Sequence, residues 1–247
     1  MNREKVKKFW YDRAQAVNVP RPESLVNFQR DAVTADLYLK TELAVINAEL
    51  PLKNSDVLVD LGAGNGRFSL LFAPKVRKVA AVEYIEGFAA EIAKQARERG
   101  YTNIEVLNSP AEDFCVVNSA DVIFVSGLLH YLDNEQYDQT VNNISKTLKP
   151  GGILFLRETI SVLENEFIVD KFSEELGAYY CSIYRTGGQH IETLSQKQFM
   201  LLKAGPFFEN GSIFNKRLET HLHYFIFQKR IPRINSDIKA YPEDAGY

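Results

Sequence analysis

The stretch from Val57 to Ala73, VLVDLGAGNGRFSLLFA, constrains the fold of this chain more than any other. Its first residues, Val57-Leu58-Val59, are too few for a helix and are bounded by turn residues, which predicts a strand buried on both faces. The glycines that follow let the backbone turn tightly and leave no Cβ between the chain and a ligand. Because open α/β sheets bind ligands at the carboxyl ends of their strands, this stretch predicts a nucleoside-binding α/β domain.

Apolar strands and helical patterns alternate through the next hundred residues. Strands are predicted at 78–83, 104–107, 120–125 and 153–157, with helices at 85–99 and 134–148 between them. This alternation predicts right-handed crossovers and a parallel sheet with helices on both faces. A helix from Ser195 to Ala204 and strands at 207–214 and 221–228 are predicted after it.

The first 52 residues are predicted to be helical. One amphipathic helix is expected over residues 3–16 and a second from about Ser24 to Leu50, with the proline-rich segment 19–22 between them. Two roles remain open for this part of the chain. It packs onto the domain through its aromatic residues, or it forms a lid over the active site with Tyr11 or Arg13 touching the substrate.

Composition bounds the class of protein. A chain of 247 residues with 45% hydrophobic residues is expected to form one domain, divided into a lid (1–52), a core (53–158), a substrate insertion with closing strands (159–230) and a tail (231–247). The net charge of −3 gives no basic footprint for nucleic acid. No signal-like start or run of about 18 apolar residues is present, so we expect a cytoplasmic protein that does not bind membranes.

The glycine pattern separates two nucleoside-binding groups. A dinucleotide fold requires G-x-G-x-x-G, whose third glycine allows close packing of the helix. Here the run is Gly62-Ala63-Gly64-Asn65-Gly66-Arg67, and Arg67 stands where that third glycine is needed. The run therefore departs from the dinucleotide fingerprint by one position, and S-adenosylmethionine is the alternative ligand.

Five motifs in order then resemble the class I S-adenosylmethionine-dependent methyltransferases: VDLGAGNGRF, AAVEYIEGF, NSPAEDF, DVIFVSGLLHYL and LKPGGILFLRE. The match covers roughly residues 55–158. It implies a Rossmann-like, doubly wound and mostly parallel seven-stranded sheet, closed by an antiparallel C-terminal hairpin and covered by an N-terminal helical lid.

The resemblance also implies the residues that bind S-adenosylmethionine. The turn that holds Gly62 and Gly64 would approach the methionine part and the ribose, with Asp60 near the amino end. Glu83 would accept both ribose hydroxyls, since a carboxylate offers only acceptors. Tyr84 and Ile85 would flank the adenine, and Ala111 and Glu112 would recognise its edge. Ser126 and Leu128 would line the methionine side.

The sequence after the fourth strand restricts the methyl acceptor. It has neither the N/D-P-P-Y/F run of amino-methylating enzymes that act on adenine or glutamine nor a nucleophilic cysteine, which favours a small-molecule acceptor. His130 is the best candidate for a general base, because an imidazole titrates near neutrality and follows a strand end. Helix capping is the alternative role. Phosphobase methyltransferases, which the chain resembles loosely, pair such a histidine with a lid tyrosine, here Tyr11.

The segment 177–190 is predicted to be a glycine-bearing loop that contacts the substrate. It gathers tyrosines, an arginine and a histidine, and arginine binds carboxylate and phosphate through two hydrogen bonds. Packing over the edge of the sheet is the alternative role for this loop. The candidate substrate ligands are Tyr180, Tyr184, Arg185, His190 and Arg157, which ends the fifth strand. His221 and His223 have no third partner at a recognisable spacing, so no metal site is predicted.

Together these observations predict transfer of a methyl group from S-adenosylmethionine to oxygen or nitrogen of a small polar acceptor. Phosphorylated, sugar and phosphoramidate-like metabolites are the candidates, because the tyrosines and the arginine suit an anionic ligand. Methylation of RNA or protein and a non-catalytic cofactor-binding subunit are the alternatives. An NAD oxidoreductase is disfavoured by Arg67.

Overall fold

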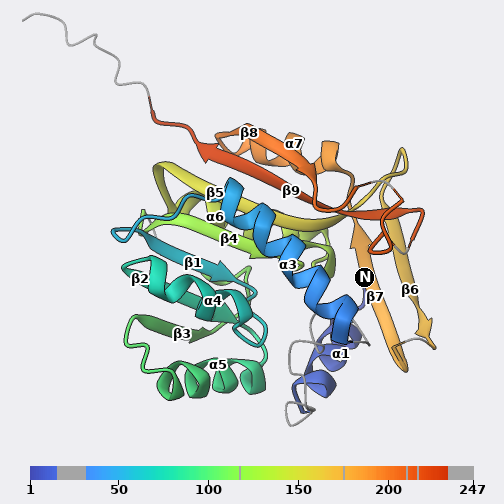
Figure 1. The fold of residues 1–247 in the computed structure, drawn as a ribbon. Helices are drawn as coiled ribbons and strands as arrows, with labels where there is room; N and C mark the ends of the chain where they lie inside the picture. Colours follow the sequence, from blue (N-terminus) through green and yellow to red (C-terminus); the bar gives the residue numbers. More distant parts are fainter. Residues whose placement is uncertain (16–31, 117, 175, 210, 216, 233–247) are drawn as a thin grey trace, which may run out of the picture.

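A seven-stranded sheet forms the centre of the computed structural model, which describes residues 1–15, 32–116, 118–174, 176–209, 211–215 and 217–232 (Figure 1). The strand order is β3-β2-β1-β4-β5-β9-β8. The first five strands along the chain pair in parallel, whereas β9 is antiparallel to both of its neighbours. The bounds are β1 (Val57–Leu61), β2 (Lys78–Glu83), β3 (Ile104–Asn108), β4 (Ala120–Ser126), β5 (Leu148–Ser161), β8 (Phe199–Pro206) and β9 (Thr220–Lys229). This order confirms the predicted fold class.

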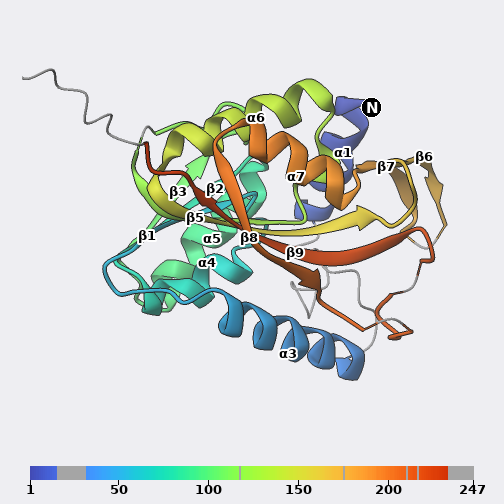
Figure 2. The ribbon, with the colours of Figure 1, turned by 90° about the horizontal axis from the view of Figure 1, so that it is seen from above.

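Helices cover both faces of the sheet (Figure 2). α3 (Ala32–Glu49), α4 (Arg67–Phe72) and α5 (Glu86–Glu98) pack on one face, and α6 (Asn134–Thr147) and α7 (Gly187–Gln196) pack on the other. α1 (Arg3–Gln15) lies beside a separate two-stranded hairpin made of β6 (Phe167–Ser173) and β7 (Ala178–Tyr184). Short 3-10 helices follow α4 (Ala73–Lys75) and β4 (Leu129–Tyr131).

The core forms because successive residues of each central strand point to opposite faces. In β4, Val122 and Phe124 belong to the cluster under α3 and α4, while Ile123 and Val125 belong to the cluster under α6. Nearly continuous apolar strands are typical of a parallel sheet covered on both sides. The carboxyl ends of these strands are consequently the edge where polar side chains gather.

The C-terminal part departs from the prediction. The predicted helix over Ser195–Ala204 is wrong, because α7 begins earlier, at a capping box in which Thr186 and Gln189 satisfy each other's backbone amides. Residues 199–206 form the edge strand β8, and Phe199 is fully buried beside Phe227. The hairpin that closes the sheet is therefore β8–β9, and no strand forms over the described residues of 207–214.

The insertion after the fifth strand is also more regular than predicted. β5 continues to Ser161, four residues beyond the predicted end at Arg157. Residues 178–184, predicted to belong to a loop, form strand β7. The N-terminal prediction holds for α1 and for the described part of the second helix, α3, whereas the predicted helix boundaries between residues 16 and 31 lie outside the described residues.

The contact between Gly66 and Ile92 of α5 can be tested by substitution. Gly66 has φ +83°, and a Cβ there would lie 2.8 Å from Ile92 Cγ1; Gly100 has φ +70° with no atom within 4 Å of its Cβ position. Both alanine variants carry the cost of left-handed backbone, but only Gly66→Ala adds steric overlap, which costs about 1–3 kcal/mol. In urea unfolding, we expect Gly66→Ala to lose more unfolding free energy than Gly100→Ala. Equal losses in the two variants would contradict the close contact between Gly66 and Ile92.

Candidate active site

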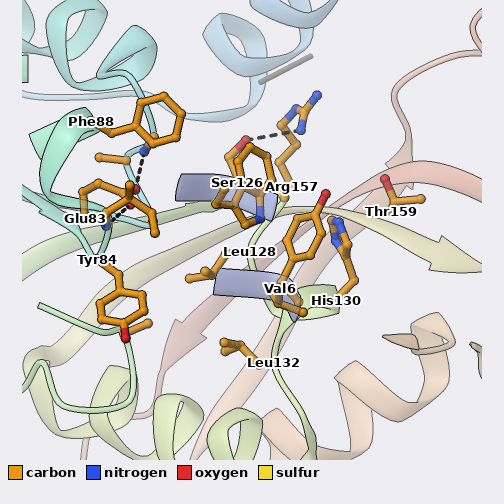
Figure 3. A pocket seen from close by; sticks show the side chains of 18 of the residues that line it. Val6, Glu83, Tyr84, Phe88, Ser126, Leu128, His130, Leu132, Arg157 and Thr159 are labelled. Atoms are coloured by element: carbon orange, nitrogen blue, oxygen red, sulfur yellow. Dashed lines mark hydrogen bonds between the residues drawn. The ribbon is translucent and has the colours of Figure 1, made fainter. Parts of the chain in front are cut away.

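A cavity of about 580 Å³ opens at the carboxyl ends of β1, β2, β4 and β5. Its volume is in the range typical of small-molecule sites. Figure 3 shows Glu83 and Tyr84 on one side, Arg157, His130 and Thr159 on the other, and Ser126 and Leu128 between them. α1 contributes to the wall through Arg3, Glu4, Val6, Lys7 and Trp10.

The glycine turn and the acid after β2 are joined by hydrogen bonds. The amides of Gly64 and Ile85 each donate to the carboxylate of Glu83, at 2.7 Å. Gly62 and Gly64 have φ values of +76° and +57°, which favour glycine, and both line the cavity. The conformation of the glycine turn is therefore stabilised by Glu83, the acid that the family resemblance assigns to the ribose hydroxyls.

Two buried acids in this region have raised pKa values. Burial raises the pKa of Glu83 to about 7, although the amides of Ile85 and Gly64 oppose the shift. Burial likewise raises the pKa of Asp60 to about 6, partly offset by the hydroxyl of Ser69, which donates to Asp60 at 2.6 Å. Glu83 lines the cavity, but Asp60 lies behind the turn and is not part of the wall.

The end of the cavity beyond Glu83 contains the residues predicted to hold an adenine. Tyr84 is 44% exposed, while Ile85 is buried. Ala111 and Glu112 follow β3 and face the same space, where Gln136 of α6 donates a hydrogen bond to the Glu112 carboxylate. The structure thus brings together every predicted cofactor residue except Asp60.

His130 lies at the other end, on the short helix after β4. Its Nδ1 is hydrogen-bonded to Oε1 of Glu158, a fully buried carboxylate whose Oε2 accepts the amide of Leu129 at 2.8 Å. Burial acts to raise the pKa of Glu158, but the imidazole more than offsets this and holds the pKa below its usual value. The ionised carboxylate therefore accepts Nδ1–H and leaves Nε2 as the ring nitrogen that can take a proton.

Three tyrosine hydroxyls form a chain beside His130. The hydroxyls of Tyr131 and Tyr180 are 3.1 Å apart, and those of Tyr180 and Tyr184 are 2.8 Å apart. Tyr184 stacks on the His130 ring, with a centroid separation of 5.2 Å. Burial raises the pKa of Tyr131 and Tyr180 well above the usual value, so both hydroxyls stay protonated and can donate. All three line the cavity.

A second charged group occupies the opposite face of β5. The guanidinium of Arg157 pairs with Glu42 of α3, and it donates to the hydroxyls of Tyr38 at 2.9 Å and Ser126 at 3.2 Å. Arg67 pairs with the same carboxylate at 2.6 Å. Burial acts to lower the pKa of Arg157, but Glu42 and Tyr38 more than offset this and leave it raised.

Three residues predicted to act on the substrate do not reach the cavity. Tyr11 lies on the outer face of α1 and is 55% exposed. Arg185 is buried and donates to the carbonyls of Leu129 and Leu132 and to the side chain of Asn134. His190 is buried against the Tyr137 hydroxyl at 2.9 Å, and burial lowers its pKa to about 4. Arg185 and His190 thus support the site from behind.

The structure adds site residues that the sequence analysis missed. Glu158 directly follows the predicted end of β5, so extending that strand by one residue would have identified it. Tyr38 and Glu42 are polar side chains within a mostly apolar helix, and Glu42 is fully buried, a position that an acid occupies only when it is paired. Trp10, one turn along α1 from Val6, lines the cavity where Tyr11 was predicted.

Comparison with known proteins identifies the domain. Residues 58–152 match the family model described as a methyltransferase domain. Phosphoethanolamine N-methyltransferase 1 of Triticum aestivum is 32% identical over 168 residues, which are 64% of this chain and 31% of that protein. The protein of the same name from Caenorhabditis elegans is 31% identical over 121 residues, 49% of this chain and 25% of that protein. The chain thus spans a quarter to a third of the length of these curated relatives.

Solved structures share the whole architecture. The structure of Haemonchus contortus phosphoethanolamine N-methyltransferase 1 with phosphoethanolamine and S-adenosylhomocysteine has a TM-score of 0.72 at 19% identity, covering 95% of this chain and 50% of that one. A 1,6-didemethyltoxoflavin-N1-methyltransferase from Burkholderia thailandensis has a TM-score of 0.64 at 19% identity, covering 92% of this chain and 91% of that one. The chain therefore has the fold of these S-adenosylmethionine-dependent methyltransferases, and its residues 58–152 match the methyltransferase-domain model, in agreement with its motifs.

Among the described residues, no group of three or more histidine, cysteine, aspartate or glutamate side chains is arranged to hold a metal ion. None of the described helices has the length and apolar character needed to cross a membrane.

The pKa of Glu83 predicts how stability depends on pH. The folded state binds a proton to Glu83 up to about pH 7, whereas the ordinary value is 4.5, so its stabilising contribution is present below pH 4.5 and is lost as the pH rises to about 7. Relative to Glu83→Gln, the unligated wild type should lose about 3 kcal/mol of unfolding free energy across that interval. A difference between the two proteins that is independent of pH, measured by urea unfolding, would contradict this assignment.

The contacts of Arg185 predict a structural rather than a substrate-binding role. A lysine ammonium cannot reach both carbonyls and Asn134 at once, so Arg185→Lys leaves buried acceptors unpaired. We expect a loss of about 1–3 kcal/mol in unfolding free energy. The exposed Arg97 provides the control, since Arg97→Lys should change stability by less than about 0.5 kcal/mol.

Proposed function

We propose that this protein transfers a methyl group from S-adenosylmethionine to nitrogen or oxygen of a small, phosphorylated acceptor. The observation that carries the proposal is that one cavity joins a glycine turn held by Glu83 to the buried His130–Glu158 pair. The first of these suits a nucleoside cofactor, and the second can remove a proton. Similarity to phosphoethanolamine N-methyltransferases supports the acceptor class.

The residues present fit the cofactor. Gly62 has φ +76°, and a Cβ there would lie 3.1 Å from the side chain of Leu128, so both backbone and packing favour glycine at this point of the wall. Glu83 is a buried carboxylate facing the cavity, and a pair of hydroxyls is a suitable partner for it because an ionised carboxylate only accepts hydrogen bonds. Gly64, Tyr84, Ile85, Ala111, Glu112 and Ser126 would complete the site. When bound, S-adenosylmethionine supplies the methyl group and a neutral thioether as the leaving group.

His130 then acts on the acceptor. Methyl transfer is a displacement at carbon, so the main task of the protein is to align the acceptor atom with the methyl group. A hydroxyl or ammonium acceptor must also lose a proton, and His130 Nε2 accepts it while Glu158 stabilises the imidazolium that forms. The hydroxyl chain of Tyr131, Tyr180 and Tyr184 donates to polar atoms of the acceptor.

α1 closes one side of the cavity. Trp10 packs edge-on against Tyr131 at 5.1 Å and against Phe88 at 6.4 Å, so the helix contacts both ends of the site. Its position supports the lid role that the sequence left open. In this arrangement Trp10 and Val6 shield the reacting atoms from water, and Tyr11 remains on the outside.

Turnover tests this proposal. The protein is incubated with S-adenosylmethionine and phosphoethanolamine, and S-adenosylhomocysteine is quantified. We expect acceptor-dependent product formation, and His130→Ala should lower kcat by about 10²- to 10⁴-fold, the usual contribution of a general base, while S-adenosylhomocysteine affinity is retained. Glu158→Gln should lower kcat by a smaller factor, because the imidazole loses the charge that stabilises its protonated form.

His221 supplies the matched control, since it lies on β9 outside the cavity wall and His221→Ala should keep wild-type kcat. Full activity of His130→Ala would overturn the role of the base. Failure to bind S-adenosylhomocysteine would overturn the proposed function as a whole.

A further inference from the structure

Charged side chains of both signs line the cavity. Among the described residues, the carboxylates in its wall are Glu4 of α1, Glu83 after β2 and Glu112 after β3. The cations in the wall are Arg3, Lys7, Arg67, Arg157 and Arg217. Arg3 is paired with Asp133 and Glu135, and Lys7 lies over the Tyr84 ring. Arg67 and Arg157 form the arginine half of the cavity, which is complementary to an anion.

Within the arginine half, two guanidinium groups share one carboxylate. Glu42 is completely buried and pairs with both Arg67 and Arg157. Each guanidinium has five N–H donors, so one carboxylate cannot satisfy both. Arg157 Nε is buried and has no hydrogen-bond partner among the described residues.

The neighbouring acids are engaged elsewhere. Glu158 accepts from His130 and from the amides of Leu129 and Thr159, and Asp60 accepts from Ser69. Buried cationic groups are stable only when they are paired and hydrogen-bonded, so the remaining donors call for an anionic partner.

Arg157 lies close to His130, the proposed general base. Gly127, between β4 and the short helix of His130, has φ +64°, and its Cβ position is 3.7 Å from Arg157 Nη1 and 3.9 Å from His130 Cε1. A small molecule can therefore touch both side chains across the glycine. Its anionic group and its methylated atom would be separated by only a few bonds.

We propose that Arg67, Glu42 and Arg157 form an oxyanion subsite that holds the phosphate-like group of the methyl acceptor. This inference rests on the proposed function and deepens it. Glu42 sets the charge of the subsite by neutralising one of the two arginines. The carboxylate of the cofactor is the other possible source of an oxyanion, since Arg67 directly follows the glycine turn. The Cβ position of Gly127 lies within 4 Å of both Arg157 Nη1 and His130 Cε1, and this favours the acceptor.

Calorimetric titration of inorganic phosphate into protein saturated with S-adenosylhomocysteine tests the subsite. We expect phosphate to bind wild type, Arg157→Met to weaken it at least about tenfold, and Glu42→Gln to strengthen it, because the second arginine is then released. Affinity for S-adenosylhomocysteine should not change in either variant, which also shows that both are folded. The double variant Glu42→Gln/Arg157→Met removes both members of the pair, and it should bind phosphate more weakly than Glu42→Gln.

Three results would overturn the subsite. The first is that wild type does not bind phosphate, and the second is that Glu42→Gln binds phosphate more weakly than wild type. The third is that Arg157→Met loses affinity for S-adenosylhomocysteine but keeps its affinity for 5′-methylthioadenosine. The last result would assign the arginines to the cofactor carboxylate. Phosphate binding as expected without turnover would contradict the proposed function instead, so the two failures are distinguishable.

Discussion

The hydrogen bonds from the amides of Gly64 and Ile85 to Glu83 connect two strand-to-helix turns through one carboxylate. One turn follows β1 and the other precedes α5, so the spacing between them depends on this side chain. The carboxylate is buried, and burial raises its pKa. The protein thus retains a costly buried acid at the position where it organises the cofactor half of the cavity and faces the space that a ligand would fill.

The acceptor half is organised differently, by charges that come from distant parts of the chain. Arg157 binds the Tyr38 hydroxyl across 119 residues of sequence, and Glu158 binds His130 across 28. α3 covers one face of the sheet and still contributes to the site, through Tyr38 and Glu42. Tyr131, Tyr180 and Tyr184 pack in one cluster beside these charged groups, and a less polar environment strengthens each charge–charge contact.

Residues predicted for the cofactor half lie around the cavity more often than residues predicted for the acceptor half, for a physical reason. Glycine turns and strand ends are local, so the positions of Gly62, Gly64 and Glu83 follow from nearby motifs, and the family resemblance implies their roles toward the cofactor. Arg185 could not be assigned correctly, because a guanidinium that holds backbone carbonyls has the same sequence signal as one that binds a substrate. The C-terminal helix was misplaced because Thr186 and Ser195 both begin a capping pattern, and only packing of Phe199 under the sheet decides between them.

The pairing of β5 with β9 has a consequence for the chemistry of the cavity. The two strands are in register from Ile153 opposite Gln228 to Ser161 opposite Thr220. Adjacent residues of a strand face opposite sides, so this register directs Arg157 toward α3 and Glu158 toward His130. A slip of one residue would exchange the cation and the anion between the two faces. The polarity of the acceptor site is therefore fixed by the backbone pairing of β5 with both of its neighbours, β4 and β9.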